Sequence, residues 1–212
     1  MKRCLSLLAV LMVAVVAQPS LAALNAYLRL AGEYQGVIEG GVTQVGREGS
    51  IMVIASSHEV LVSRDPANGL PTGKRQHEPL RITKEIDKST PLLMKALIDN
   101  ERLRQFELRY WRPAASGQEV QYYTIVLRNA RIVSIQQEML NNKYPENMQH
   151  KEREHVSFVY ETIEWIYEDG GIATEDGWHY AGADLLISDV TGDGIVNLLD
   201  LAIVAQEWLT RR

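Results

Sequence analysis

The segment from Asp189 to Asp200 has the residue types and spacing of a calcium-binding loop. Ca²⁺ takes six to eight oxygen ligands at roughly 2.3–2.6 Å, and a loop of about 12 residues supplies them only if it turns sharply at its sixth position. Gly194 occupies that position. The predicted metal ligands are four side chains and one backbone carbonyl, from Asp189, Thr191, Asp193, Asp200 and Ile195 respectively.

Two positions of this loop depart from the usual pattern, and a third can contribute a ligand through water. Thr191 stands at the third position and is a neutral, weaker ligand than a carboxylate. Asp200 replaces the usual glutamate at the last position, so the loop must close more tightly. Asn197 is placed to act through a water molecule.

A helix is predicted directly after the loop, because residues 196–209 carry an apolar stripe with helical periodicity. The loop and this helix together resemble one repeat of a type I dockerin module. That family normally carries two repeats, and one is found in this chain. An acidic turn before a terminal helix is the alternative, and the combined spacing favours calcium.

The beginning of the chain predicts a secretory signal peptide over residues 1–22. Lys2 and Arg3 are followed by an apolar run, and Ser20 and Ala22 place small residues before a cleavage site at Ala23. The run is too short for a mature membrane span, so no stable membrane insertion is expected after cleavage. We therefore expect a secreted, extracellular or periplasmic protein. Cys4 is the only cysteine, so the mature chain has no disulfide.

Charge divides the mature chain into two parts. Residues 23–166 hold equal numbers of acidic and basic side chains, whereas residues 167–212 hold two basic and nine acidic ones. Neither part is basic enough to predict nucleic-acid binding. The glycine- and acid-rich segment from Glu168 to Gly177 is predicted to be a linker. It separates a body, residues 23–178, from a calcium repeat, residues 179–212.

The body is predicted to be mainly β, a sandwich or barrel with one helix packed on it. Alternating or β-branched runs predict strands at residues 51–54, 59–62, 106–112, 122–127, 130–135 and 156–165. Asn129 and Ala130 are placed to form a tight hairpin. Ser89 and Pro91 predict the start of a helix that continues to about Arg104. The prolines and glycines of 65–79 predict a long loop.

Three segments of the body resemble the Hcp family, the tube proteins of type VI secretion. They are Gly73 to Leu93, Tyr123 to Ile135 and His155 to Trp165, and the resemblance extends over about Asn25 to Trp178. It implies a compact β-barrel with a flanking helix, assembly into hexameric rings that stack into a tube, and effector cargo in the lumen. The predicted loop at 65–79 is similar to the family's protruding loop, which makes ring and stack contacts. Family members ordinarily lack a signal peptide and a dockerin-like tail.

The sequence carries no motif that predicts catalysis. Its histidines, at 58, 77, 150, 155 and 179, lack a metalloprotease spacing, and phosphate-binding, dinucleotide and nucleophile-elbow motifs are absent. Lys74, Arg75, Lys84 and Lys88 are interpreted as surface or subunit-contact residues. A pair of facing carboxylates from distant strands, as in a glycosidase, stays open.

Three hypotheses from different classes follow. The first is an exported, structural, ring-forming Hcp-like tube protein with a calcium-binding repeat, which is not an enzyme. The second is an extracellular module that docks onto a cohesin-type partner through the dockerin-like repeat. The third is a carbohydrate-active enzyme with a dockerin tag. The resemblance favours the first, with the second as its alternative.

Overall fold

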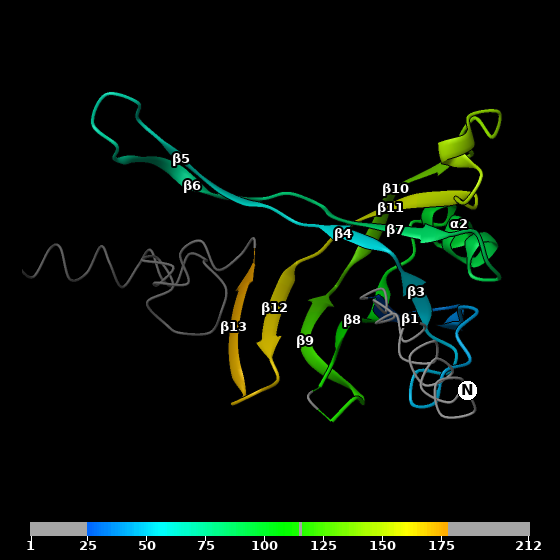
Figure 1. Cartoon of the computed structure of the whole chain (residues 1–212). Helices are drawn as coiled ribbons and strands as arrows, with labels where there is room; N and C mark the ends of the chain where they lie inside the picture. Colours follow the sequence, from blue (N-terminus) through cyan, green and yellow to red (C-terminus); the bar gives the residue numbers. More distant parts are fainter. Residues whose placement is uncertain (1–24, 115, 178–212) are drawn as a thin grey trace, which may run out of the picture.

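The computed structural model describes residues 25–114 and 116–177, and two antiparallel β-sheets form the body of this part of the chain (Figure 1). The large sheet has the strand order β13-β12-β9-β8-β1-β2, with β3 also paired to β1. Its strands are β1 (Ala26–Gly32), β2 (Gly36–Ile38), β3 (Ile51–Val53), β8 (Leu103–Pro113), β9 (Glu119–Arg128), β12 (Thr162–Tyr167) and β13 (Ile172–Gly177).

The small sheet has the strand order β10-β11-β7-β4. Its strands are β4 (Ala55–Ser57), β7 (Leu80–Glu85), β10 (Arg131–Glu138) and β11 (Arg153–Val159). Two further strands, β5 (Val60–Arg64) and β6 (Pro71–His77), pair with each other. The helices of the described ranges are α2 (Thr90–Ile98) and the short 3₁₀ helix η1 (Pro145–Asn147).

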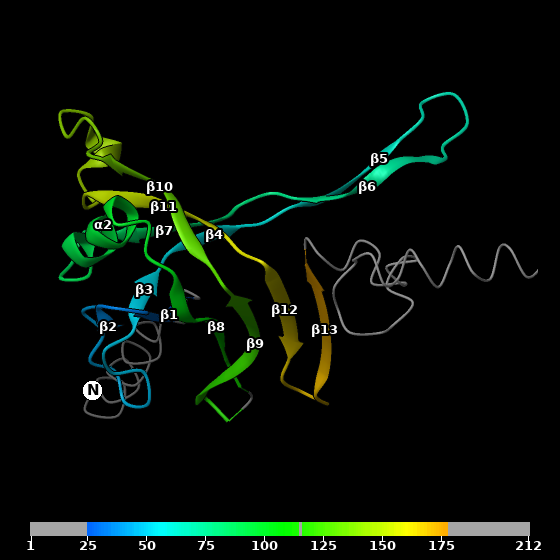
Figure 2. The same cartoon turned by 180° about the vertical axis from the view of Figure 1, so that it is seen from behind.

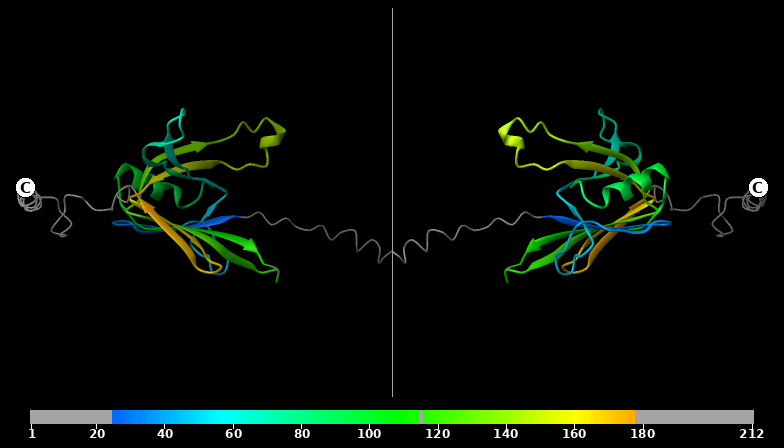
Figure 3. Two further views of the ribbon diagram at one scale, coloured as in Figure 1. Left: turned by 90° about the vertical axis from the view of Figure 1, so that its left-hand side faces the viewer. Right: turned by 90° about the vertical axis from the view of Figure 1, so that its right-hand side faces the viewer.

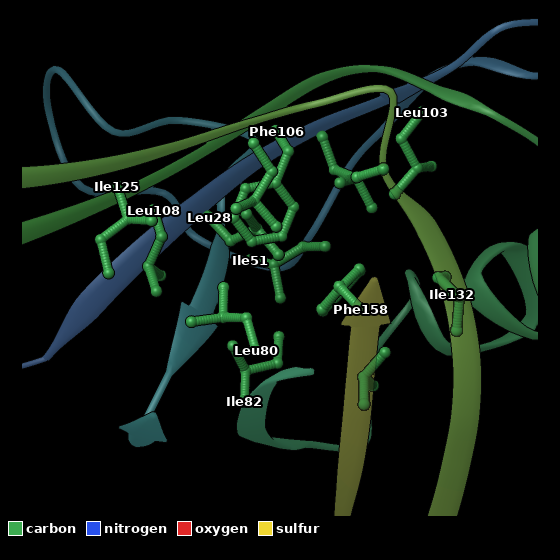
Figure 4. Packing of buried hydrophobic residues seen from close by; sticks show 14 of the residues in the cluster. Leu28, Ile51, Leu80, Ile82, Leu103, Phe106, Leu108, Ile125, Ile132 and Phe158 are labelled. Atoms are coloured by element: carbon green, nitrogen blue, oxygen red, sulfur yellow. The ribbon is translucent and has the colours of Figure 1, made fainter. Parts of the chain in front are cut away.

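The hydrophobic core lies between the two sheets, which form two layers when they are seen edge-on (Figure 3). Phe106 of β8 and Phe158 of β11 meet there edge to face, with 4.9 Å between their ring centroids. Figure 4 shows Leu28 and Ile51 of the large sheet near Leu80 of the small one. Alternate residues of each strand supply this core because successive side chains of a strand point to opposite faces.

Each predicted strand is present at about its predicted position, except that one of them is divided into two strands. The alternating run at 156–165 is two strands, β11 and β12, because the chain leaves the small sheet at Tyr160 and Glu161 and enters the large one. Both halves keep their alternation, and Phe158 and Ile163 are fully buried. Periodicity alone therefore hides the point at which a chain changes sheets.

The helix begins as predicted and ends earlier. Ser89 occupies the N-cap position and Pro91 lies in the first turn, but α2 stops at Ile98 instead of continuing to about Arg104. Asn100 has a φ of 48°, a left-handed conformation that commonly ends a helix. The apolar side chain of Leu103 therefore belongs to the first residue of β8.

The predicted mainly β fold with a flanking helix is confirmed, but the predicted barrel is not closed. The described strands form separate sheets that do not close into one hydrogen-bonded ladder. Asn129 and Ala130 do not make the predicted tight hairpin either, because β9 lies in the large sheet and β10 in the small one. Asn129 has a φ of 51°, and this turn carries the chain from one layer to the other.

The predicted linker from Glu168 to Gly177 is wrong as well. It is a turn followed by β13, which pairs with β12 from Thr162↔Gly177 to Tyr167↔Ile172. Gly170 and Gly171 both have positive φ values, 85° and 64°, so the glycines that predict a linker serve as a hairpin turn. The last described strand of the large sheet is therefore acidic and lies at the edge.

Candidate functional site

A hairpin formed by β5 and β6 projects away from the two sheets (Figures 1 and 2). Its strands pair from Val60↔His77 to Arg64↔Pro71, with a register shift after Val62. The predicted long loop at 65–79 is therefore wrong over most of its length. Only its first residues form the tip, where the Asp65 carboxylate accepts a hydrogen bond from the Ala67 N–H at 2.7 Å.

The projecting hairpin exposes apolar side chains. Val60, Leu61, Val62 and Leu70 are 37%, 41%, 45% and 62% exposed. An isolated two-stranded hairpin is marginally stable in water, and exposed apolar side chains on strands with open edges are typical of a surface that pairs with another chain. The hairpin is therefore our candidate interaction site, in line with the predicted protruding loop.

A cluster of side chains, the root cluster, joins this hairpin to the body. It consists of His58, Arg75, His77, Tyr160 and Asp176. His58 Nε2 lies 2.5 Å from the Tyr160 hydroxyl, and His77 Nδ1 lies 3.0 Å from the same hydroxyl. His58 lies just before β5 and His77 is the last residue of β6. The Tyr160 hydroxyl therefore contacts both chain segments at the root of the hairpin.

Asp176 completes the root cluster from the edge of the large sheet. Its carboxylate pairs with the Arg75 guanidinium, and His77 Nε2 lies 3.2 Å from its Oδ2. Burial opposes ionisation of Asp176, but hydrogen bonds from Arg75 and from the Gly177 N–H lower its pKa. Burial and the nearby Asp176 charge both raise the pKa of the Tyr160 hydroxyl. The phenol is therefore neutral and the carboxylate is ionised at neutral pH.

A second polar cluster, formed by strands of the small sheet and the start of α2, lies inside the body. Lys84 of β7 is fully buried, and its Nζ lies 2.8 Å from Glu154 Oε1 and 2.9 Å from Asp87 Oδ1. Glu154 is fully buried too, and it accepts a hydrogen bond from the Thr90 hydroxyl at 2.9 Å. The interpretation of Lys84 as a surface residue is therefore wrong.

Asp87 ties this buried pair to the start of α2. Burial opposes its ionisation, but hydrogen bonds from Ser89 and Lys84 lower the pKa of Asp87. Its Oδ2 also accepts a hydrogen bond from the Gly41 N–H at 3.0 Å. The cluster holds the helix start, β7 and β11 together, which is a structural role.

The outer strands of the large sheet are β13 at one end of its order and, at the other end, β2 and β3, which pair with different parts of β1. Within the described part of the chain, neither outer edge is paired with a further strand. β13 exposes Ala173, Thr174 and Glu175. Open edges at both ends give the sheet two surfaces on which a strand of another chain can add.

The predicted calcium ligands lie outside the described residues. These are Asp189, Thr191, Asp193, Ile195 and Asp200. Among residues 25–114 and 116–177, no group of three or more His, Cys, Asp or Glu side chains is placed to hold a metal ion. No helix within these ranges is both long and apolar enough to cross a membrane.

The structure brings two of the predicted histidines together and separates the others. His58 and His77 share the root cluster, whereas His155 Nδ1 lies 2.9 Å from Thr83 Oγ1 on the small sheet. His150 is exposed, and His179 lies outside the described residues. The root cluster is not predictable from the sequence, because its members are spread between His58 and Asp176, with one contact spanning 102 residues, and share no local motif.

Comparisons with known proteins agree with this architecture. The family model described as "Type VI secretion system effector, Hcp" matches residues 27–167. A Pseudomonas aeruginosa protein called "Major exported protein" is 40% identical over 162 residues, which cover 72% of this chain and 94% of the relative.

Solved structures match a similar share of the chain. A crystal structure of an Hcp protein is 33% identical, with a TM-score of 0.69, and the match covers 74% of this chain and 98% of that one. A mutant Hcp1 from E. coli EAEC 042 is 36% identical, with a TM-score of 0.66 and coverages of 74% and 99%. The secreted protein Hcp3 from Pseudomonas aeruginosa is 33% identical, with a TM-score of 0.60 and the same coverages. This chain therefore belongs to the Hcp family of type VI secretion proteins.

Proposed function

We propose that the chain is a structural subunit that assembles into closed rings, the repeating unit of a secretion tube. The observation that carries this proposal is the projecting hairpin with its exposed apolar side chains, in a chain of the Hcp family. The open edges of β13 and β2 add two different surfaces at opposite ends of one sheet. A contact between two different surfaces of identical subunits generates a ring when the rotation closes. Six subunits is the number that the family resemblance implies, with effector cargo in the lumen.

Sedimentation tests ring formation directly. We expect the chain from Ala23, with and without residues 178–212, to sediment in EDTA as one species with about the mass of a closed ring. Calcium is not required, because the predicted ligands lie outside the ring-forming body. A stable monomer at micromolar concentration of both forms would contradict the proposal and favour the docking alternative.

Export of the subunit is the second part of the proposal. Its support is the predicted signal peptide at 1–22, together with the printed name of the Pseudomonas aeruginosa relative, which calls that protein exported. A cleaved signal peptide delivers the mature chain across the inner membrane, so rings of this subunit form outside the cytoplasm. The protein is then secreted, extracellular or periplasmic.

One Ca²⁺ bound by the tail is the third part. The spacing of Asp189, Asp193 and Asp200 predicts that a closed loop brings their carboxylates together, and a cation would then offset their mutual repulsion. We expect calorimetry to detect one Ca²⁺ per chain, and Asp189→Ala or Asp200→Ala to abolish the binding heat. Asp184→Ala, which removes a carboxylate just outside the loop, is the matched control and should leave binding unchanged. Equal binding by all three variants would exclude this loop as the site.

Docking onto a cohesin-type partner is the alternative function. The sequence pattern that favours it is the calcium-loop spacing followed directly by apolar residues of helical periodicity, which resembles one dockerin repeat. Capture on an immobilised cohesin that is lost on chelation would support it. The three parts of the main proposal do not require such a partner.

A further inference from the structure

The tip of the hairpin carries the only asparagine–glycine pair of the sequence, Asn68–Gly69. Both residues are exposed. In such a pair the backbone nitrogen of the glycine can attack the side-chain amide carbon of the asparagine, because glycine has no side chain to hinder the approach. The attack forms a five-membered succinimide ring and releases ammonia, and water then opens the ring to aspartate or isoaspartate. The pair therefore has the chemistry of a spontaneous modification site.

The amide of Asn68 is held in an orientation that favours this attack. Its Oδ1 accepts a hydrogen bond from the Leu70 N–H at 2.9 Å, and its Nδ2 lies 3.3 Å from Asp65 Oδ2, to which it donates. A donor at Oδ1 withdraws electron density from the amide carbon and stabilises the negative charge that the oxygen gains during the attack. The Leu70 N–H is therefore placed to stabilise the tetrahedral intermediate.

The attacking nitrogen must first leave a hydrogen bond. The Gly69 N–H donates to the Asp65 carbonyl at 2.8 Å. The other bonds that hold the tip come from the hairpin itself, from the Asp65 N–H to the Leu70 carbonyl at 2.8 Å and from Arg64 to the Gly69 carbonyl at 2.9 Å. Local opening of an exposed turn costs much less free energy than global unfolding. Among the described residues, an atom added at the Cβ position of Gly69 would meet nothing within 4 Å, so the backbone has room to turn.

Asn141 is a matched comparison within the same chain. It is exposed as well, and its Oδ1 accepts a hydrogen bond from the Lys143 N–H at 3.1 Å. Each of the two asparagines thus has a backbone donor two residues ahead on its amide oxygen. Asn141 is followed by Asn142, whose side chain hinders the attack. A difference in reactivity between Asn68 and Asn141 therefore isolates the contribution of the glycine.

We propose that Asn68 is a site of spontaneous deamidation, in which the Gly69 nitrogen is the nucleophile and the Leu70 N–H stabilises the intermediate. The bond from the Gly69 nitrogen to Cγ of Asn68 forms, and the bond from Cγ to Nδ2 breaks. Hydroxide takes the proton of the Gly69 nitrogen, and Nδ2 takes a proton from water and leaves as ammonia. Water then adds to either carbonyl of the ring. One water is consumed, one ammonia is released and one negative charge is added to the tip.

The product changes the candidate interaction site. Deamidation replaces the Nδ2 donor, which now bonds to Asp65, with a second carboxylate, so that two like charges face each other across the turn. The isoaspartyl product also adds one carbon to the main chain within the turn. Both products therefore weaken the turn and make the tip more acidic. The reaction takes place within a single subunit, so it does not depend on ring assembly.

Peptide mapping by mass spectrometry tests the site on the full chain, kept at about pH 6 and at about pH 8. A tryptic peptide of residues 65–74 contains Asn68, and one of residues 132–143 contains Asn141. We expect the first peptide to gain about 1 Da and to separate into an aspartyl and an isoaspartyl form. Its conversion should be at least about tenfold faster than that of Asn141. Because hydroxide takes up the proton, the rate should rise by up to about tenfold per pH unit.

Two variants make the test specific. Gly69→Asn keeps a residue that adopts the positive φ of 73° but adds a side chain, and it should slow the conversion of Asn68 at least about tenfold. Val62→Glu places a charge in the hairpin to keep subunits apart, and sedimentation records the state of each sample. Conversion in Val62→Glu alone would support the site and show that assembly covers the tip. Asn68 that stays intact in both chains, or that converts no faster than Asn141, would overturn the proposal. Circular dichroism verifies that each chain is folded.

Discussion

Replacing Lys84 by methionine is expected to lower the free energy of unfolding by about 3–5 kcal/mol. The change leaves the Glu154 carboxylate fully buried without its cation, which lies 2.8 Å away in the intact protein. Methionine has a similar volume and fills the same space, so the loss is electrostatic and not a cavity effect. Denaturant unfolding at neutral pH, followed by circular dichroism, measures it.

Two further variants make this result specific. Lys88→Met removes an exposed lysine whose Nζ lies 3.0 Å from Glu39 Oε2, and it should change stability by no more than about 1 kcal/mol. Lys84→Met combined with Glu154→Leu removes both buried charges and should recover most of the loss, because an apolar pair often replaces a buried ion pair without penalty. Equal effects of the two lysine variants would show that the buried pair contributes little.

Val62→Glu in the hairpin is expected to eliminate the ring. Val62 is 45% exposed in the single chain, so burying the exposed part of this side chain contributes roughly 1 kcal/mol. Val62→Glu loses this contribution and places a carboxylate in an apolar contact, which adds a desolvation cost, and a closed ring repeats the loss at every interface. Sedimentation should therefore detect a monomer where the unmodified chain sediments as a ring.

The matched control for this variant lies on the small sheet. Val133 of β10 is 46% exposed, so Val133→Glu introduces the same charge at an equally exposed valine away from the hairpin. Its ring should persist. Loss of the ring in both variants would point to added charge as the cause, and persistence in both would place the subunit contact elsewhere.

Strands and the start of the helix are predictable from the sequence because they depend on local patterns. Alternation sets the face of each strand, and Ser89 with Pro91 marks the first turn of α2. The sheet to which a strand belongs depends on distant partners, so the crossover at Asn129 resembles a hairpin turn in the sequence. The glycines and acids of 168–177 likewise suit a linker and a hairpin turn equally well.

The candidate site is predictable only in part. Prolines and glycines mark residues 65–79 as unusual, and the resemblance to the Hcp family identifies the segment as a projection. Its strand pairing is hidden because Pro71 and Gly73 are poor strand formers. The root cluster and the buried Lys84–Glu154 pair join residues that are 70 or more positions apart. A lysine within an alternating strand gives no sign that its partner is buried.

The order in which the chain visits the two sheets has a consequence for how the protein is made. β1 to β3 belong to the large sheet, β4 and β7 to the small one, β8 and β9 to the large one again, β10 and β11 to the small one, and β12 and β13 to the large one. The small sheet is complete only when β11 has been synthesised, and the large sheet only when β13 has. Non-local pairing of this kind slows folding, and partly made sheets have exposed edges. On the proposed export route through a cleaved signal peptide, the chain would cross the membrane before its layers assemble.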